Sequence, residues 1–208
     1  MIKAVIFDID GVVMDSFPAN LNFFQDLMEK NGYQPPTAEE YRQIFHYNLY
    51  DAIKVLSKTT NEQEIMKMWE EGRRLAGQYY IRFSTMTIGA AKAVKALRKK
   101  YKLGIVTSRV AETMFVGPSL EELKKYFGAA VSYQDTVNHK PHPEPLLLAA
   151  RKLEVRPNEC VYIGDVENDI VTARAADMRV IIYSHKKFDN ADACISSFKE
   201  LPELIKTL

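Results

Sequence analysis

The sequence predicts an α/β fold: a Rossmann-like parallel sheet flanked by helices, with a small all-helical cap domain inserted after the first strand. Three observations predict it. Short apolar runs have the composition of buried strands, helical patterns lie between them, and one long stretch contains no strand pattern. Strands that alternate with helices are typical of βαβ units, which build parallel sheets.

Five runs rich in β-branched and aromatic residues are predicted to be buried strands. Near-continuous apolar runs of this length are typical of strands that are covered on both faces. The runs are residues 3–8, 103–107, 130–133, 160–164 and 179–183. Helices are predicted over residues 88–101, 119–127, 143–153, 167–176 and 197–208.

The stretch from residue 17 to about residue 84 has helical spacing throughout, as in Leu21, Phe24, Leu27 and Met28. We predict about four helices here. The chain is thus divided into a Rossmann-like core, residues 1–15 and 85–208, and a helical cap, residues 16–84. Within the cap, the aromatic segment 45–50 (FHYNLY) could line a pocket or pack against neighbouring helices.

Composition limits the class of partner. The 208 residues include 28 basic and 27 acidic ones, so bulk charge indicates neither a nucleic-acid-binding nor a membrane-binding surface. No apolar run approaches the roughly 20 residues of a membrane span, and the N-terminus lacks the pattern of a secretory signal. Cys160 and Cys194 lie in apolar contexts typical of buried free thiols. We expect a cytoplasmic protein, a monomer or homodimer, that binds a small molecule.

Polar residues follow the predicted strands at the points where ligands bind in parallel sheets, beyond the carboxyl ends of the strands. One group of these residues follows the first predicted strand, and a second group follows the second strand. A lysine lies in a proline-rich loop after the third strand, and two further acids follow the fourth. They are Asp8, Asp10, Gly11, Thr107, Ser108, Arg109, Lys140, Asp165 and Asp169.

This set of residue types predicts chemistry on a phosphoryl group. Several carboxylates in one crevice repel one another unless a cation lies between them, and Mg²⁺ prefers oxygen ligands. Lys140 and Thr107 could bind phosphoryl oxygens. Asp8 and Asp10, at positions i and i+2 of an extended segment, point the same way, so one could attack phosphorus while the other transfers protons. Gly11 would let the chain turn sharply after them.

Four segments resemble, in the right order, the four sequence motifs of the haloacid dehalogenase-like (HAD-like) hydrolases. They are FDIDGVV, VTS, KPHPEP and GDVEND, and the resemblance covers nearly the whole chain. The helical insert resembles the cap of the subgroup that contains phosphoglycolate phosphatases, pyrophosphatase-type phosphatases and β-phosphoglucomutases.

The resemblance implies a role for each residue of the motifs. Asp8 would be the nucleophile and a Mg²⁺ ligand, and Asp10 the acid/base, with its backbone carbonyl on the metal. Thr107 and Lys140 would bind the transferring phosphoryl group, with backbone N–H groups near Gly11 and Ser108 as further donors. Asp165 would be a metal ligand, and Asp169 a ligand directly or through water. Asp169 also falls near a helix start, where an acid caps free N–H groups.

The implied activity is Mg²⁺-dependent hydrolysis of a small phosphorylated metabolite through an aspartyl-phosphate. Asn20 stands where β-phosphoglucomutases carry a histidine, which favours a phosphatase over a phosphosugar mutase. A metal-independent dehalogenase generally lacks the second aspartate, so Asp10 counts against it. A non-catalytic phosphate-binding module is the remaining alternative. Arg109 and the segment 111–119 have no predicted function.

Overall fold

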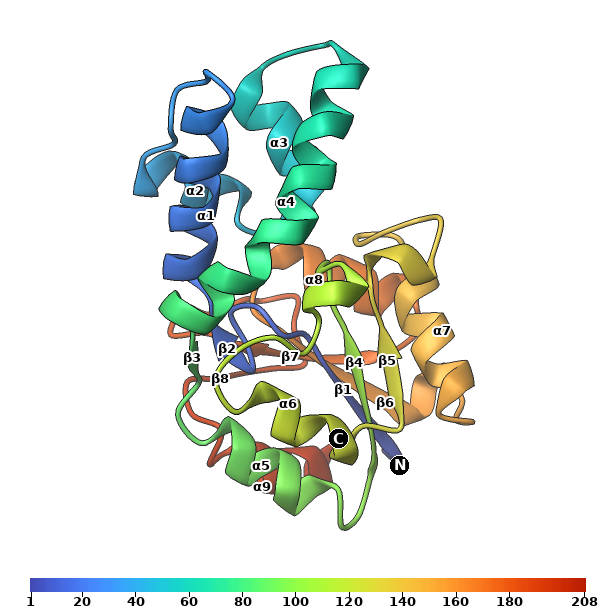
Figure 1. The fold of residues 1–208 in the computed structure, drawn as a ribbon. Coiled ribbons are helices and arrows are strands. Elements are labelled where there is room, and N and C mark those ends of the chain that lie inside the picture. Colours follow the sequence, from blue (N-terminus) through green and yellow to red (C-terminus); the bar gives the residue numbers. More distant parts are fainter.

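The computed structural model describes residues 1–208. It contains a sheet with helices on both faces and a helical domain beyond the carboxyl ends of its strands (Figure 1). The sheet has six strands in the order β5-β4-β1-β6-β7-β8, and every neighbouring pair is parallel. The predicted α/β fold class is therefore confirmed.

The strands of this sheet differ from the prediction mainly at one edge. They are β1 (Ala4–Phe7), β4 (Lys102–Val106), β5 (Ala129–Val131), β6 (Cys160–Gly164), β7 (Arg179–Tyr183) and β8 (Ala193–Ile195). The first five coincide with the five predicted runs to within two residues. The edge strand β8 was not predicted, because three residues between polar neighbours are too few to show a period.

The helices of the core are α5 (Ala90–Leu97), α6 (Leu120–Leu123), α7 (Glu144–Lys152), α8 (Glu167–Ala175) and α9 (Leu201–Leu204). The helices predicted over residues 88–101 and 197–208 are longer than the observed α5 and α9. Gly89 adopts a positive φ of 88° before α5, so that helix begins at Ala90 rather than residue 88. Both α6 and α9 pass into short 3₁₀ turns, Lys124–Tyr126 and Ile205–Thr207.

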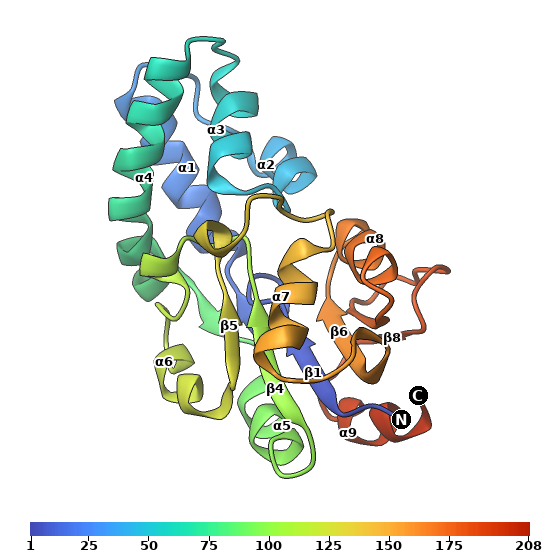
Figure 2. The same cartoon turned by 90° about the vertical axis from the view of Figure 1, so that its right-hand side faces the viewer.

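Alternation along the strands divides the core between the two faces of the sheet. Val5 and Phe7 of β1 belong to one buried cluster, together with apolar residues of α5, α6 and α9. Ala4 and Ile6 belong to the other, together with residues of α7 and α8. Figure 2 shows this layered arrangement, with both chain termini at the end of the core opposite the cap.

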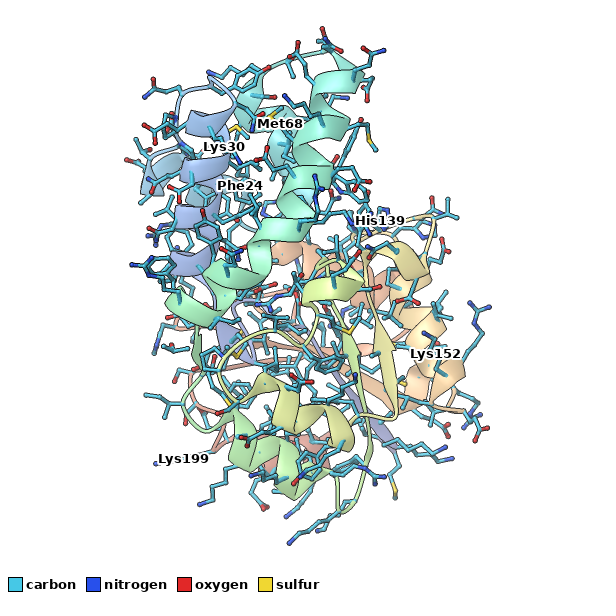
Figure 3. All side chains as sticks on the ribbon, viewed as in Figure 1. Phe24, Lys30, Met68, His139, Lys152 and Lys199 are labelled. Atoms are coloured by element: carbon cyan, nitrogen blue, oxygen red, sulfur yellow. The ribbon has the colours of Figure 1, made fainter.

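The cap consists of α1 (Phe17–Lys30), α2 (Ala38–Ile44), α3 (Leu49–Ser57) and α4 (Glu62–Phe83), as many helices as predicted. It has its own cluster of 13 buried residues, including Phe24 and Met68, which Figure 3 places between the cap helices. Lys152 and Lys199, by contrast, project from the outer surface of the core. Cap and core thus have separate hydrophobic interiors.

Two short strands carry the chain between core and cap. They are β2 (Met14–Asp15) and β3 (Thr85–Met86), which pair antiparallel. The predicted cap boundaries, residues 16 and 84, adjoin this pair, and the division into two domains stays a prediction. None of the helices has the combination of length and apolar character that crossing a bilayer requires.

Candidate active site

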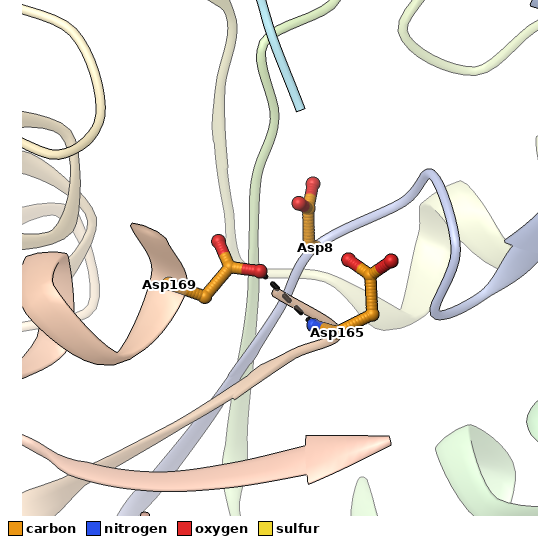
Figure 4. Close-up of side chains that lie close together, drawn as sticks. All are labelled: Asp8, Asp165 and Asp169. Atoms are coloured by element: carbon orange, nitrogen blue, oxygen red, sulfur yellow. Dashed lines mark hydrogen bonds between the residues drawn. The ribbon is translucent and has the colours of Figure 1, made fainter. Parts of the chain in front are cut away.

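Three carboxylates meet at the carboxyl ends of the two central strands. Asp8 directly follows β1, Asp165 directly follows β6, and these strands are neighbours in parallel register, with Phe7 opposite Ile163. Asp169 lies in the first turn of α8. One oxygen from each of the three carboxylates lies within 4.8 Å of the others (Figure 4). The strand register therefore assembles an all-oxygen group suited to a hard divalent cation.

Lys140 reaches this group from the loop between β5 and α7. Its Nζ lies 2.6 Å from Asp8 Oδ2 and 2.9 Å from Asp169 Oδ1. It also donates to the hydroxyl of Tyr162, 3.1 Å away. The lysine is thus fixed between two acids and a tyrosine, in a mostly buried position.

Asp169 has the capping role considered for it, and its role as a metal ligand stays a prediction. Its Oδ2 accepts hydrogen bonds from the backbone N–H groups of Asp165 at 3.0 Å and Val166 at 3.3 Å, which would otherwise lack a partner at the start of α8. Its Oδ1 faces Lys140 and the Tyr162 hydroxyl. The carboxylate is fully buried and held rigidly by these contacts.

Burial and mutual repulsion shift the acid–base properties of the group. Burial raises the pKa of the Asp8 carboxyl to about 7, against the opposing effect of Lys140 and with a further contribution from Asp169. Burial, and then the charges of Asp169 and Asp8, raise the pKa of Asp165. Burial alone would lower the pKa of Lys140, but the carboxylates of Asp169 and Asp8 outweigh it and raise that pKa. Three acids around one lysine leave excess negative charge, which a bound cation would neutralise.

Asp10 does not join the three carboxylates, although it lies only two residues from Asp8. Its side chain forms a bidentate ion pair with Arg109: Nε lies 2.9 Å from Oδ2, and Nη2 lies 2.6 Å from Oδ1. The Ser16 hydroxyl also donates to Oδ1. Asp10 therefore faces the cap side of the site, while Asp8 faces Lys140.

Arg109 is the residue that sequence reasoning missed. Its Nη1 donates to the carbonyls of Thr113, at 3.2 Å, and Val116, at 2.8 Å, within the unassigned segment 111–119. Its guanidinium carbon lies 3.6 Å from the ring centroid of Tyr80 on α4. The signal in the sequence was its position two residues beyond Thr107, at a strand end, but its partner Asp10 is 99 residues away.

Thr107, Ser108 and Gly11 are placed differently from one another. Ser108 lines the cavity between core and cap. Thr107 is buried, and its hydroxyl accepts the backbone N–H of Arg109 at 3.2 Å. The N–H of Gly11 donates to the carbonyl of Met14 at 2.8 Å. A phosphate-binding role for these three residues stays a prediction.

The local structure explains why glycine occupies position 11. Its φ is +77°, and a Cβ at this position would lie 2.1 Å from Asp165 Oδ2. No side chain fits there without displacing that carboxylate. The glycine allows the chain to turn away after Asp10 while the loop stays packed against Asp165.

The charged core residues described above form the floor of a cavity between core and cap. The cap covers this floor with a wall of aromatic side chains. Of the predicted aromatic segment, Phe45, His46, Tyr47 and Leu49 line the cavity. Asn20 of α1 also lines it, and its Oδ1 accepts the Tyr80 hydroxyl at 3.0 Å. The cavity thus joins the two domains, with ionic groups below and rings above.

Comparison with known proteins identifies the family. The model of the family described as haloacid dehalogenase-like hydrolase matches residues 5–183. The chain belongs to this family. It is an enzyme, and its class within the family is that of the phosphatases.

Individual relatives agree with this assignment. Pyrophosphatase PpaX of Bacillus pumilus is 29% identical over 184 residues, which cover 84% of this chain and 80% of the relative. The crystal structure of a HAD-superfamily hydrolase, subfamily IA, variant 1, from Geobacter sulfurreducens has 32% identity and a TM-score of 0.70, covering 98% of this chain and 96% of that one. A β-phosphoglucomutase from Clostridium difficile, 22% identical, superposes with a TM-score of 0.86 over 100% of this chain and 96% of that chain, which shows a shared fold.

Proposed function

We propose that this protein is a Mg²⁺-dependent phosphatase that hydrolyses a small phosphorylated metabolite through an aspartyl-phosphate on Asp8. One observation carries the proposal. The buried carboxylates of Asp8 and Asp169 and the half-buried carboxylate of Asp165 converge within 4.8 Å, and Lys140 forms ion pairs with the two buried ones. Phosphoryl transfer depends mainly on positioning and charge neutralisation, and these groups provide both.

The residues present fit Mg²⁺. All three side chains are oxygen donors, and the raised pKa values of Asp8 and Asp165 reflect in part the negative charge that a cation would offset. Asp8, Asp165 and Asp169 would hold the ion, together with the backbone carbonyl of Asp10 that the family resemblance implies. A bound Mg²⁺ would shield the negative charge of the phosphate from that of the carboxylates.

Asp8 is the group placed to act as nucleophile. Its Oδ1 accepts the Ile9 N–H at 2.7 Å and its Oδ2 faces Lys140, so the carboxylate is held in one orientation. In the first step an oxygen of Asp8 bonds to phosphorus, and the bond from phosphorus to the ester oxygen breaks. Asp10 supplies the proton that the departing alkoxide takes up. Lys140 would neutralise charge on the phosphoryl oxygens, with the Thr107 hydroxyl and the backbone N–H groups near Gly11 and Ser108 as the further donors that the family resemblance implies.

In the second step water attacks the phosphorus of the aspartyl-phosphate. Asp10, now ionised, takes a proton from that water, and the bond between phosphorus and Asp8 breaks to release inorganic phosphate. Both steps use the same carboxyl of Asp10, so its orientation matters twice. Arg109 sets that orientation in this structure, and we assign it the role of a positioning residue.

The cap would keep bulk water from the reacting groups, since its aromatic residues close the cavity above them. Asn20, at the position where β-phosphoglucomutases carry histidine, hydrogen-bonds Tyr80 rather than an acid. The position thus supports hydrolysis over phosphosugar transfer.

The test is release of inorganic phosphate from a panel of phosphate esters, nucleotides, sugar phosphates and pyrophosphate, with Mg²⁺ and with a chelator. We expect Mg²⁺-dependent release from at least one ester, and a loss of about a thousand-fold or more in Asp8→Asn. Asp189→Asn, an exposed acid far along the chain in a surface loop, is the matched control and should keep full activity.

Two outcomes would contradict the proposal. Sugar-phosphate isomerisation without free phosphate would indicate a mutase that uses the same residues. Activity retained by a folded Asp8→Asn variant would show that another group attacks phosphorus.

A further inference from the structure

The cavity contains few positive charges, and each of them already has a partner. Among the residues that line it, Lys140 and Arg109 are the only lysine or arginine. Lys140 is bonded to Asp8 and Asp169. Arg109 is paired with Asp10. Neither charge is free to bind a second anionic group on a substrate.

The guanidinium group of Arg109 has no free hydrogen-bonding direction towards the cavity, because neighbouring groups contact it on every side. Its side chain is 1% exposed, against 21% for its partner Asp10. Two backbone carbonyls accept from Nη1, and the ring of Tyr80 covers the guanidinium. A carboxylate or phosphate entering the cavity would therefore have to displace Asp10 to reach it.

The cap adds no cation to the wall. None of its four arginines lines the cavity, and three of them, Arg42, Arg73 and Arg82, lie over the rings of neighbouring aromatic residues. His46 does line it, but burial lowers the pKa of its imidazole, which keeps the ring neutral near pH 7. The wall is dominated by rings, namely Phe23, Phe24, Tyr41, Phe45, Tyr47 and Tyr80.

We propose that this cavity selects phosphate monoesters whose leaving group is uncharged and carries a flat or apolar body, and that it rejects leaving groups with a carboxylate or a second phosphate. The inference deepens the proposed function and rests on it. Mg²⁺ and Lys140 together would supply three positive charges, which the three carboxylates of Asp8, Asp165 and Asp169 already match. A second anion would lie near four carboxylates with no free cation, and burying an unpaired charge is costly. Rings, in contrast, offer packing surface to an apolar leaving group.

Two matched pairs of compounds test the selectivity of the Mg²⁺-loaded enzyme. Phenyl phosphate and 4-carboxyphenyl phosphate differ in one carboxylate on the same ring, and ethyl phosphate and phosphoglycolate differ in a carboxylate that replaces a methyl group. We expect kcat/KM to be about ten-fold or more higher for the uncharged member of each pair. Pyrophosphate, whose leaving group is itself a phosphate, should also be a poor substrate.

A pair of variants then locates the selectivity in the wall. Tyr47 lines the cavity and is 39% exposed, so Tyr47→Lys adds a cation at the rim with little risk to the fold. It should shift the ratio of kcat/KM values towards 4-carboxyphenyl phosphate by about five-fold. Val55→Lys adds the same charge on α3 at a 45% exposed position that does not line the cavity, and should leave the ratio unchanged.

Each outcome decides the matter. Equal or faster turnover of the carboxylate-bearing esters, or of pyrophosphate, would overturn this inference and leave the phosphatase assignment standing. So would a Tyr47→Lys variant, folded by circular dichroism, whose ratio equals that of Val55→Lys. No phosphate release from any compound would instead defeat the proposed function, and this inference with it.

Discussion

The floor of the active-site cavity and the wall that the cap contributes present opposite kinds of side chain. The floor holds four carboxylates with Lys140 and Arg109, all supplied by the core. The wall holds mostly aromatic rings from α1, α2, the α2–α3 connection and α4. In our proposal, the floor contains the groups that act on a phosphoryl group, whatever is attached to it. The wall contains the groups that would contact the rest of the substrate.

A change in the floor should affect all substrates alike. Lys140→Ala removes the one ammonium group bonded to Asp8 and Asp169, so kcat/KM should fall by about a thousand-fold for every ester tested. Steady-state assays on two unrelated esters measure it, with the exposed Lys199→Ala as control. A loss confined to one ester would break the distinction between floor and wall.

Arg109 belongs to the floor but touches the cap through Tyr80. Arg109→Ala should lower kcat by about a hundred-fold, because Asp10 loses the group that orients it for two proton transfers. KM should change less. Arg109→Lys keeps the positive charge but loses the planar pair of N–H donors that contacts both oxygens of Asp10. It should recover part of kcat. Thermal melts give the folded fraction. If kcat per folded enzyme were unchanged in both variants, Arg109 would have only a structural role.

The floor should also be the pH-sensitive part. Burial raises the pKa of Asp8 to about 7, and a metal binds only its ionised form. Lowering the pH from 8 to 6 should therefore weaken Mg²⁺ binding by about ten-fold. Calorimetric titration at both pH values measures this. An affinity independent of pH would show that Asp8 does not take up a proton when the ion leaves.

The raised pKa of Asp8 also affects the stability of the folded protein. The direction of this effect follows from how many protons the folded and unfolded states bind. Without metal, the folded state keeps the Asp8 proton up to about pH 7, whereas the unfolded chain releases it near the ordinary pKa of 3.8. The free energy of unfolding contributed by this group therefore falls as the pH rises between these values. Asp8→Asn has no proton to lose, so its metal-free melting temperature should decline less over this range.

A change in the wall should alter preference rather than chemistry. Phe45→Ala removes a half-buried ring from the cavity wall, so kcat/KM should fall by about five-fold for phenyl phosphate and change little for ethyl phosphate. Ile81→Ala, a 66% exposed cap position that does not line the cavity, is the control. An equal loss for both esters would place Phe45 among the groups that support the floor.

Most of the floor could be predicted from the sequence, because its acids lie at or just beyond strand ends. Asp8, Asp165 and Asp169 follow adjacent parallel strands, so any correct assignment of β1 and β6 brings them together. Lys140 was predicted from its place in a proline-rich loop after β5. The metal, the nucleophile and the proton-transfer roles of these residues are still predictions.

The rest of the site could not be predicted, because it depends on where side chains point. Nothing in the order of residues shows that Arg109 turns towards Asp10, since the turn after β4 and the carbonyls of Thr113 and Val116 fix that direction. In the aromatic segment, Phe45 lines the cavity whereas Tyr50 donates its hydroxyl to Glu62. Helical spacing alone did not separate them.

The paired strands β2 and β3 connect the two domains in a way that would allow the cap to be replaced. The chain leaves the core through β2 and returns through β3, and these strands are paired neighbours, so the two ends of the insert lie about 5 Å apart. Any helical segment whose termini lie that close could be grafted between Asp15 and Thr85 without lengthening or cutting a strand of the main sheet. If the cap sets substrate preference, as we propose, that preference would move with the insert as one block, while the main sheet keeps its strands.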